Sequence, residues 1–323
     1  MKIVVVDRNL VPHRERFEAA LPPDSTAHWP DGCTTELEDL RDADVVVGGR
    51  FTAAMAEAAE KVRLVHAGGA GVDKIDFAAL APDVLVANTF HHEQSIAEYT
   101  LAAAILLRRG FLTQDRALRD GIWATSVYDP SIPQPRALQG AHVGFVGFGH
   151  IGRRSWGLFR AFGCTGAAVT GSGRLDAGAE GLAWTADVGQ LDRLMTESDV
   201  VVVSAPLTER TEGMIGAPQL RALGPDGVLI NVGRGPLVAE DALYEALSNR
   251  TIAAAAIDVW YRYPASDGRA APSDLPFATL PNLLMTPHSS GVTRDTFVGR
   301  VDDIAANIGR LQRGEPLQNV VTR

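Results

Sequence analysis

Short, almost wholly apolar runs alternate with longer amphipathic stretches along the first third of the chain. Four of these runs predict strands, at residues 2–7, 43–48, 62–67 and 84–88. Because the runs lack polar alternation, they are typical of parallel strands that are buried on both faces. The Ala- and Glu-rich stretches between them, such as 14–21 and 53–61, predict helices. The pattern therefore indicates a series of strand–helix units.

A second series of apolar runs follows and predicts six more strands, at residues 142–146, 166–169, 199–204, 227–232, 252–259 and 283–286. Two such series predict an α/β fold with two doubly wound parallel-sheet domains. A long helical stretch that begins near Ser95 joins them. Residues 294–312 predict a last amphipathic helix, and its apolar stripe needs a partner. We expect this helix to pack back on the first domain.

Charge and composition exclude several classes of partner. The 323 residues carry a formal net charge of −9, which argues against nucleic acid and anionic membranes. The longest apolar run in a predicted helix, at 101–107, is far shorter than a membrane span, and the N-terminal run is too short for a signal peptide. The two cysteines, Cys33 and Cys164, match no metal-site spacing, so we expect free thiols and no metal. These features predict a cytoplasmic protein.

A glycine motif follows the first strand of the second series. Residues 142–152 read HVGFVGFGHIG, with the spacing Gly147-x-Gly149-x-x-Gly152 between a strand and a helix. In a dinucleotide site the first glycine permits the tight turn, the second lets the backbone approach the pyrophosphate, and the third allows close helix packing. His150 and Ile151 fall in the first helical turn, where main-chain N–H groups meet the phosphates. The motif predicts a dinucleotide cofactor.

The end of the next strand bears on the choice of cofactor. Sites for NAD usually carry an acid there, which binds the ribose 2′-hydroxyl. Thr170 and Gly171 stand at this point, and Ser172 and Arg174 follow. Without a carboxylate, nothing repels a 2′-phosphate, and Arg174 is able to pair with one. We therefore predict NADP as the cofactor, with NAD as the alternative.

Three polar residues stand at the ends of later buried strands. Arg234 follows the strand at 227–232, Asp258 lies near the end of the strand at 252–259, and His288 follows the strand at 283–286. In open α/β sheets, ligands bind outside the carboxyl ends of the strands. We therefore expect these side chains to converge near the cofactor.

Several segments in this order resemble the D-2-hydroxyacid dehydrogenase family. They include AGGAGVDKID, LINVGRGPLVAEDALYEAL and LLMTPHSSGVT, and lie at residues 67–76, 87–109, 115–123, 138–163, 204–215, 229–247, 255–260 and 283–293. The resemblance implies a Rossmann cofactor domain, residues 101–292, inserted into a flavodoxin-like catalytic domain made of residues 1–100 and 293–323. It also implies a homodimer formed through the cofactor domain.

The resemblance further implies transfer of a hydride between NAD(P)H and a 2-oxo acid. Arg234 would hold the substrate's carboxylate and carbonyl, and His288 would exchange a proton with the carbonyl oxygen. Main-chain N–H groups at Gly69, Ala70 and Gly71 would bind the carboxylate. Asp258 would orient the nicotinamide. His288 is also expected to line the cofactor. The other residues expected to do so are Ser204, Ala205, Pro206, Thr211, Val232 and Gly233.

One position departs from the family pattern. Tyr263 stands where the family normally has a Glu paired with the catalytic histidine. A neutral phenol raises the pKa of His288 less than a carboxylate does, so either His288 works with a lower pKa and Tyr263 only orients it, or another carboxylate substitutes. The family's formate-oxidising branch also lacks this acid. Oxidation of a small anion such as formate is therefore an alternative, and a non-catalytic NAD(P)-sensing protein is another.

Two further side chains are candidates for choosing the substrate. Arg50 follows Gly48 and Gly49 at a strand end, where it is placed to bind a second anionic group such as a phosphate or phosphonate. A solvated arginine is an equally good interpretation. His91 begins the segment between the domains and is a candidate for the substrate pocket. The expected substrate is thus a small anionic molecule.

Overall fold

The computed structural model describes residues 1–31, 37–265 and 268–322. The chain forms two compact units. Unit 1 consists of Met1–His91 and Val292–Arg323, and unit 2 is the continuous segment His92–Gly291. The sequence placed these boundaries at residues 100/101 and 292/293. The first boundary differs because the whole of helix α4 (Glu93–Arg108) packs on unit 2, where Ile96 lies in the same cluster of buried side chains as Leu107.

Unit 1 is built on a five-stranded sheet in the order β2-β1-β3-β5-β7, in which every neighbouring pair is parallel. The strands are β1 (Lys2–Val5), β2 (Thr26–His28), β3 (Val45–Val47), β5 (Leu64–His66) and β7 (Leu85–Ala87). A separate parallel pair consists of β4 (Arg50–Phe51) and β6 (Lys74–Ile75). The helices in the described part of unit 1 are η1 (Arg8–His13), α1 (Arg14–Ala20), α2 (Leu37–Leu40), α3 (Ala53–Ala58) and α11 (Arg294–Arg313).

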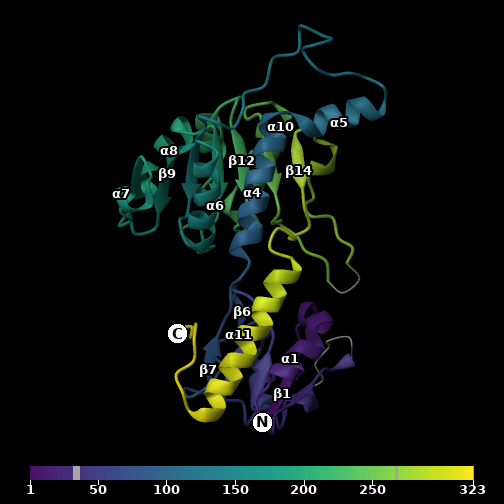
Figure 1. Ribbon diagram of the computed structural model, residues 1–323, viewed down its shortest axis with the longest axis vertical. Helices are drawn as coiled ribbons and strands as arrows, with labels where there is room; N and C mark the ends of the chain where they lie inside the picture. Colours follow the sequence, from purple (N-terminus) through teal and green to yellow (C-terminus); the bar gives the residue numbers. More distant parts are fainter. Residues whose placement is uncertain (32–36, 266–267, 323) are drawn as a thin grey trace. The chain divides into compact units, whose positions relative to one another are not determined.

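The last long helix closes the core of unit 1, as Figure 1 shows for α11 beside α1 and β1. Phe297, Val301 and Ile304 of α11 share one buried cluster with Ile3 and Phe17 from the start of the chain. The residues after α11 then pair with the sheet edge, since Val320 forms an antiparallel bridge to Ala87. The expectation that this helix packs on the first domain is confirmed.

Unit 2 contains a seven-stranded parallel sheet in the order β10-β9-β8-β11-β12-β13-β14. Its strands are β8 (His142–Val146), β9 (Thr165–Thr170), β10 (Trp184–Asp187), β11 (Val200–Val203), β12 (Val228–Asn231), β13 (Ala254–Ile257) and β14 (Leu283–Met285). The order reverses at β8, which puts the carboxyl ends of β8 and β11 side by side. In a doubly wound sheet this is the place where ligands bind.

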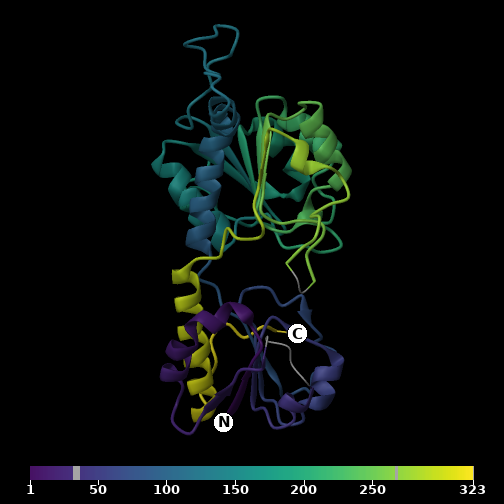
Figure 2. The same cartoon turned by 90° about the vertical axis from the view of Figure 1, so that its right-hand side faces the viewer.

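Helices cover both faces of this sheet, as seen for unit 2 in Figure 1 and Figure 2. One face packs against α4 and α6 through side chains such as Leu107 and Phe159, and the other packs against α8, α9 and α10 through side chains such as Leu194 and Leu243. The remaining helices of unit 2 are α5 (Phe111–Arg119), α6 (His150–Ala161), α7 (Ala177–Glu180), η3 (Val188–Gln190), α8 (Leu191–Glu197), α9 (Ala217–Leu223), η4 (Gly235–Leu237), α10 (Glu240–Ser248) and η5 (Phe277–Thr279).

The predicted α/β fold with two parallel-sheet domains is confirmed. The pattern missed the edge strands β2 and β10, because the sequences TAH and WTAD contain no apolar run. Cys164 is a buried free thiol, whereas Cys33 lies outside the described residues. Within the described part of the chain, no helix combines the length and the apolar character that a bilayer span requires.

Candidate active site

The glycine motif forms the loop between β8 and α6. Gly147 has a φ of +89°, and a Cβ there would lie 2.7 Å from the main-chain nitrogen of Ala205. A Cβ at Gly152 would lie 2.9 Å from the carbonyl oxygen of Gly147, so both positions require glycine. At Gly149, in contrast, no atom lies within 4 Å of the Cβ position. The loop therefore leaves free space at the point where a pyrophosphate would approach the backbone.

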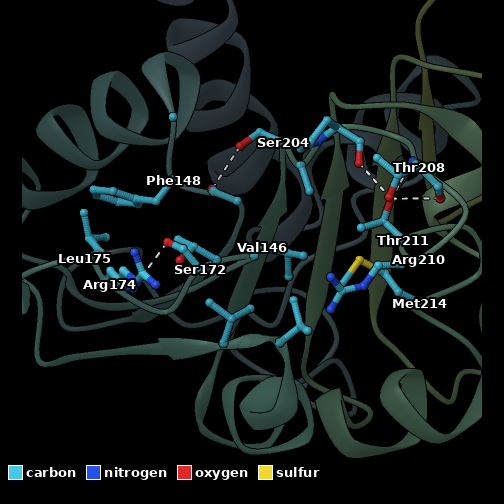
Figure 3. Close-up of a pocket in the computed structure, with 18 of the residues that line it drawn as sticks. Val146, Phe148, Ser172, Arg174, Leu175, Ser204, Thr208, Arg210, Thr211 and Met214 are labelled. Carbon is cyan, nitrogen blue, oxygen red and sulfur yellow. Dashed lines mark hydrogen bonds between the residues drawn. The ribbon is translucent and has the colours of Figure 1, made fainter.

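A cavity of about 660 Å³ opens at this loop, between the carboxyl ends of β8, β9 and β11 (Figure 3). Eight residues predicted to bind the cofactor line it: Gly147, Gly149, Ser172, Arg174, Ser204, Ala205, Pro206 and Thr211. The hydroxyl of Ser204 also donates a hydrogen bond to the carbonyl of Gly147 (3.1 Å), which ties the loop after β11 to the glycine turn. The structure thus brings together the loops that the sequence selected separately.

Other lining residues were missed at the sequence level, and Arg210 is the most informative of them. It belongs to a turn after β11, in which the Thr211 hydroxyl accepts from the Thr208 N–H (2.8 Å) and donates to the Pro206 carbonyl (2.8 Å). Thr211 therefore shapes the turn that carries Arg210. The further missed residues are Val146, Phe148, Arg153, Val169, Thr170, Gly171, Leu175, Val188, Thr208 and Met214.

The end of β9 carries no carboxylate into this cavity. The strand ends at Thr170, whose hydroxyl accepts from the Gly173 N–H (3.1 Å). The nearby acids serve helix starts instead: Asp176 accepts from the Ala179 N–H and Asp187 from the Gly189 N–H. Ser172 and Arg174 remain on the cavity wall (Figure 3). Arg174 therefore adds a positive charge to a cavity whose described lining contains no carboxylate.

Seven predicted cofactor residues do not line this cavity. Gly233 packs against Ala205, which itself lines the cavity: a Cβ at Gly233 would lie 3.0 Å from the Ala205 carbonyl oxygen. The other six lie at the start of α6 or beyond the ends of β12, β13 and β14, and their cofactor roles stay predictions: His150, Ile151, Gly152, Val232, Asp258 and His288.

Asp258 is almost fully buried at the end of β13, and its carboxylate accepts four hydrogen bonds from one loop. Oδ1 accepts from the Thr286 hydroxyl (2.6 Å) and the Ser289 N–H (2.9 Å), while Oδ2 accepts from the N–H (3.1 Å) and hydroxyl of Ser290. The Thr286 hydroxyl lies 3.0 Å from that of Tyr99 on α4, and burial raises the pKa of this phenol to about 12. Asp258 therefore holds the loop that carries His288.

His288 is exposed and stands in the middle of that loop. Its φ is +56°, a left-handed conformation that non-glycine residues adopt rarely, and its N–H donates to the Asp258 carbonyl (2.8 Å). The Tyr263 ring lies beside the imidazole, with 5.6 Å between the ring centroids. These bonds fix the histidine at the carboxyl edge of the sheet.

Tyr263 also lies near Arg234, although its hydroxyl serves its own turn. The hydroxyl accepts a hydrogen bond from the Trp260 N–H (3.1 Å). Burial raises the pKa of Tyr263, while the Arg234 charge opposes that rise. The phenol is therefore neutral near pH 7. Arg234 donates from one terminal nitrogen to the Gly233 carbonyl (2.9 Å), and the Asn231 side-chain amide donates to the Arg234 carbonyl (3.0 Å).

The residues of unit 1 that we predict to bind the substrate differ in their surroundings. Gly69, Ala70 and Gly71 belong to a loop after β5. Arg50 is exposed on β4 and stands in register with Lys74 of β6, which places two cations next to each other. The His91 imidazole instead contacts the Asp303 carboxylate of α11 (2.8 Å). Thus the structure assigns the His91 ring a partner inside unit 1.

Comparison with known proteins agrees with this architecture. The chain is 30% identical over 325 residues to a glyoxylate reductase of Korarchaeum cryptofilum, covering 99% of this chain and 94% of the relative. It is 31% identical to a D-3-phosphoglycerate dehydrogenase of Methanocaldococcus jannaschii, covering 90% of this chain but only 54% of that longer protein.

A crystal structure of a D-isomer specific 2-hydroxyacid dehydrogenase from Lactobacillus delbrueckii, in its NAD-complexed form, shares the fold. It has a TM-score of 0.82 at 24% identity, and the match covers 100% of both chains. Residues 101–290 match the description "D-isomer specific 2-hydroxyacid dehydrogenase, NAD binding domain". The chain is therefore an oxidoreductase of the D-isomer specific 2-hydroxyacid dehydrogenase family, with an NAD(P)-binding domain.

Proposed function

We propose that this protein reduces a small 2-oxo acid to a D-2-hydroxy acid and that it prefers NADPH to NADH. The observation that carries the proposal is the cavity at the glycine loop. Its wall is open at Gly149 and bears Arg174, with no carboxylate at the end of β9. An anion such as a 2′-phosphate gains from the guanidinium and meets no carboxylate among the described residues that line the cavity.

The chain's own residues divide the work of holding the cofactor. Main-chain N–H groups at the start of α6 face the pyrophosphate and lie at the positive end of the helix dipole. Arg174 pairs with the 2′-phosphate, and the turn carrying Arg210 closes the opposite wall. When bound, the nicotinamide supplies the hydride for the carbonyl carbon. Arg234 holds the substrate's carboxylate and carbonyl, because a guanidinium offers two parallel donors.

Proton transfer is the task of His288. As the general acid it donates a proton to the carbonyl oxygen during reduction, and in the reverse direction it accepts that proton. Asp258 keeps the His288 loop in place through its bonds to residues 286–290. Gly69, Ala70 and Gly71 bind the substrate carboxylate through main-chain N–H groups. Arg50 binds a second anionic group of the substrate where one is present, since Lys74 beside it adds to the local positive charge.

Initial rates test this function. We expect turnover with one or more of glyoxylate, hydroxypyruvate and bulkier 2-oxo acids, with a higher kcat/KM for NADPH than for NADH. Arg174→Ala should raise the KM for NADPH by about tenfold, the usual order for one lost charged contact, and leave that for NADH nearly unchanged. Arg221→Ala, on α9 and outside the cavity, is the matched control. A higher kcat/KM with NADH would overturn the cofactor assignment.

A second candidate function is the oxidation of a small anion such as formate, and Tyr263 is the observation that favours it. Formate oxidation needs no general acid, and the neutral phenol beside His288 supplies no carboxylate. The same assay separates the two, because formate and NADP⁺ or NAD⁺ would then give turnover where 2-oxo acids give none. Tight cofactor binding without turnover of any substrate would indicate a sensor.

The assembly of the protein remains a prediction. Large apolar side chains are exposed along the segment after α5, where it extends from unit 2 (Figure 1): Ile122, Trp123, Val127 and Tyr128. Contiguous exposed apolar residues mark interaction surfaces. They support the proposed homodimer formed through the cofactor domain.

A further inference from the structure

Helix α4 places one tyrosine against the loop that carries His288. The Tyr99 ring packs against the apolar cluster that contains Ile96 of α4, and Leu284 of β14 packs against the same cluster. The Ile96 side chain also lies 3.5 Å from the Cβ position of Gly291, at the end of the loop. Residues three positions apart share one face of a helix, so Ile96 and Tyr99 both lie on the face that packs on the loop. Packing therefore holds the ring in place and leaves the hydroxyl as its polar end.

The Tyr99 hydroxyl begins a chain of three hydrogen-bonded groups. It lies 3.0 Å from the Thr286 hydroxyl, which in turn lies 2.6 Å from Oδ1 of Asp258. The two oxygens of Asp258 accept main-chain N–H groups from Ser289 and Ser290, so this carboxylate acts as an acceptor. The single proton of the Thr286 hydroxyl therefore goes to Asp258, and the Tyr99 hydroxyl donates to Thr286. Burial raises the pKa of Tyr99 to about 12, so the phenol keeps its proton.

The main chain of Thr286 is held on the sheet independently of this chain of groups. Its N–H donates to the Ile257 carbonyl (3.1 Å), and its carbonyl accepts from the Trp260 indole N–H (2.9 Å). The backbone position is thus fixed, whereas the hydroxyl has three staggered positions about χ1. The bonds with Tyr99 and Asp258 select one of these positions. Tyr99 therefore orients the Thr286 hydroxyl toward the carboxylate.

Asp258 passes this constraint on to the main chain of His288. Its carbonyl accepts from the His288 N–H (2.8 Å), and its carboxylate accepts from the next two N–H groups of the loop. The φ of His288 is +56°, and such a conformation of a non-glycine residue persists only where surrounding bonds determine it. A weaker hold on Asp258 therefore lets the loop relax and moves the imidazole.

We propose that Tyr99 is a positioning residue for His288: its hydroxyl orients Thr286 and, through Thr286, fixes Asp258 and the loop in the geometry that proton transfer requires. The inference rests on the proposed function and adds to it a residue that the sequence did not single out. Small displacements of a reacting group lower the rate of the chemical step. Loss of the Tyr99 hydroxyl should therefore affect kcat rather than the affinity for the cofactor.

Steady-state kinetics with Tyr99→Phe, which keeps the ring and removes the hydroxyl, test the proposal. At saturating cofactor, with the 2-oxo acid that gives the fastest turnover, kcat should fall by about tenfold, the order expected for one buried hydrogen bond. The KM for the cofactor should stay unchanged. Tyr244→Phe, on α10 at the opposite face of the sheet, is the matched control and should keep wild-type kcat. Wild-type kcat in Tyr99→Phe would overturn the proposal.

A double-mutant cycle shows whether Tyr99 acts through Thr286. Thr286→Val removes the link at its other end and should lower kcat at least as much as Tyr99→Phe does. Adding Tyr99→Phe to Thr286→Val should then change kcat by less than about twofold, because the hydroxyl that it removes has already lost its partner. Thr286→Ser should retain more of kcat than Thr286→Val, since it keeps the hydroxyl. Losses that multiply in the double variant would mean that Tyr99 supports only the packing of α4, and would overturn the proposal.

Hydrogen exchange in the full chain without substrate gives a readout that needs no turnover. Tyr99→Phe should speed exchange by about tenfold at the N–H groups of residues 288–290, and Tyr244→Phe should leave it unchanged. An unchanged rate in Tyr99→Phe would overturn the proposal. If that variant does not fold, an unchanged rate in Thr286→Val would overturn it in the same way. Faster exchange in Tyr99→Phe, in a protein that turns over no 2-oxo acid, would contradict the proposed function and support the hold of Tyr99 on the loop.

Discussion

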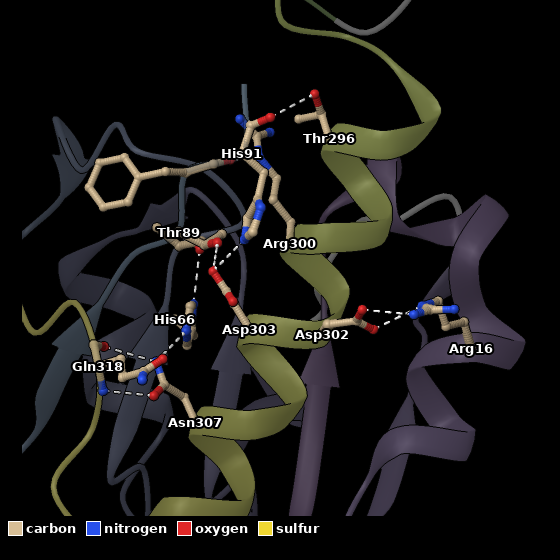
Figure 4. A network of polar contacts seen from close by, with 12 residues as sticks. Arg16, His66, Thr89, His91, Thr296, Arg300, Asp302, Asp303, Asn307 and Gln318 are labelled. Carbon is tan, nitrogen blue, oxygen red and sulfur yellow. Dashed lines mark hydrogen bonds and ion pairs between the residues drawn. The ribbon is translucent and has the colours of Figure 1, made fainter. Parts of the chain in front are cut away.

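Two histidines, one in each unit, follow buried parallel strands and have opposite surroundings. His66 ends β5 and is completely buried; its Nδ1 lies 3.0 Å from the Ala67 carbonyl and its Nε2 lies 3.0 Å from the Asn307 side-chain amide (Figure 4). His288 follows β14 in an exposed loop, with a left-handed backbone and an aromatic neighbour. The same residue type at similar places in two sheets thus has very different access to solvent.

The difference shows that hydrogen-bond partners, rather than position in the sheet, decide whether a histidine ring is held neutral in the core or is exposed to solvent. His66 holds the end of the chain: Asn307 donates to its Nε2 and to the Gln318 carbonyl, and accepts from the Gln318 N–H. This arrangement requires a neutral ring, since a protonated Nε2 would face another donor. His288 instead has its backbone fixed through Asp258 and its ring exposed, which suits the proton exchange with a substrate that we propose for it.

The largest expected effect is on catalysis. His288→Gln should lower kcat for 2-oxo acid reduction by roughly 10²–10⁴-fold, because the proposed general acid is removed, while Tm changes little for an exposed side chain. Rates under saturating cofactor measure this, and His66→Gln serves as the control, with kcat expected to stay near that of wild type. Comparable losses of kcat in both variants would erase the distinction between the two histidines.

The next effect is on stability and concerns His66. Burial lowers its pKa to about 4, from 6.5 for an ordinary histidine. Between those two pH values the unfolded chain takes up a proton at His66 that the folded chain does not. The stability that the neutral His66 preserves is therefore fully present above pH 6.5 and is lost as the pH drops toward 4. Over the whole range it amounts to about 3 kcal/mol of unfolding free energy.

Calorimetric Tm values at pH 7.5 and pH 5.0 check this expectation. Wild type should lose more stability than His66→Gln on acidification, because the glutamine does not titrate and its oxygen still accepts from Asn307. His288→Gln should keep the wild-type pH dependence. An identical fall of Tm in wild type and His66→Gln would mean that His66 is not a buried neutral group.

The smallest effect sharpens the comparison at His288 itself. Tyr263→Glu places a carboxylate beside the imidazole and should raise the apparent pKa of the reduction rate by up to about one unit, because the charge favours imidazolium. Tyr263→Gln, which is neutral, is the control and should leave the profile close to that of wild type. If the acidic group of wild type already titrates above pH 7.5, the proposed weak support of His288 by Tyr263 is wrong.

Sequence reasoning succeeded where the physical signal is local. Buried parallel strands consist of apolar runs, and the tight turn at Gly147 requires a glycine, so the sheets and the nucleotide loop were predictable. The partner of His66 stands 241 positions away in sequence, and no periodicity connects them. Contacts between distant segments carry no local signature, so these residues required the three-dimensional fold.

Helix α11 has a consequence for the order in which the protein is made. The strands and α1 of unit 1 leave the ribosome early, yet the apolar faces of Ile3, Val5 and Phe17 are covered by residues of α11. Between the two parts of unit 1 lie the 200 residues of unit 2. At roughly 5–20 residues per second, synthesis of that segment takes roughly 10–40 s, during which unit 2 is able to fold as a continuous segment. The apolar face of the nascent N-terminal sheet therefore stays uncovered until α11 has been made. Chaperones have more time to bind this part of the chain than any other.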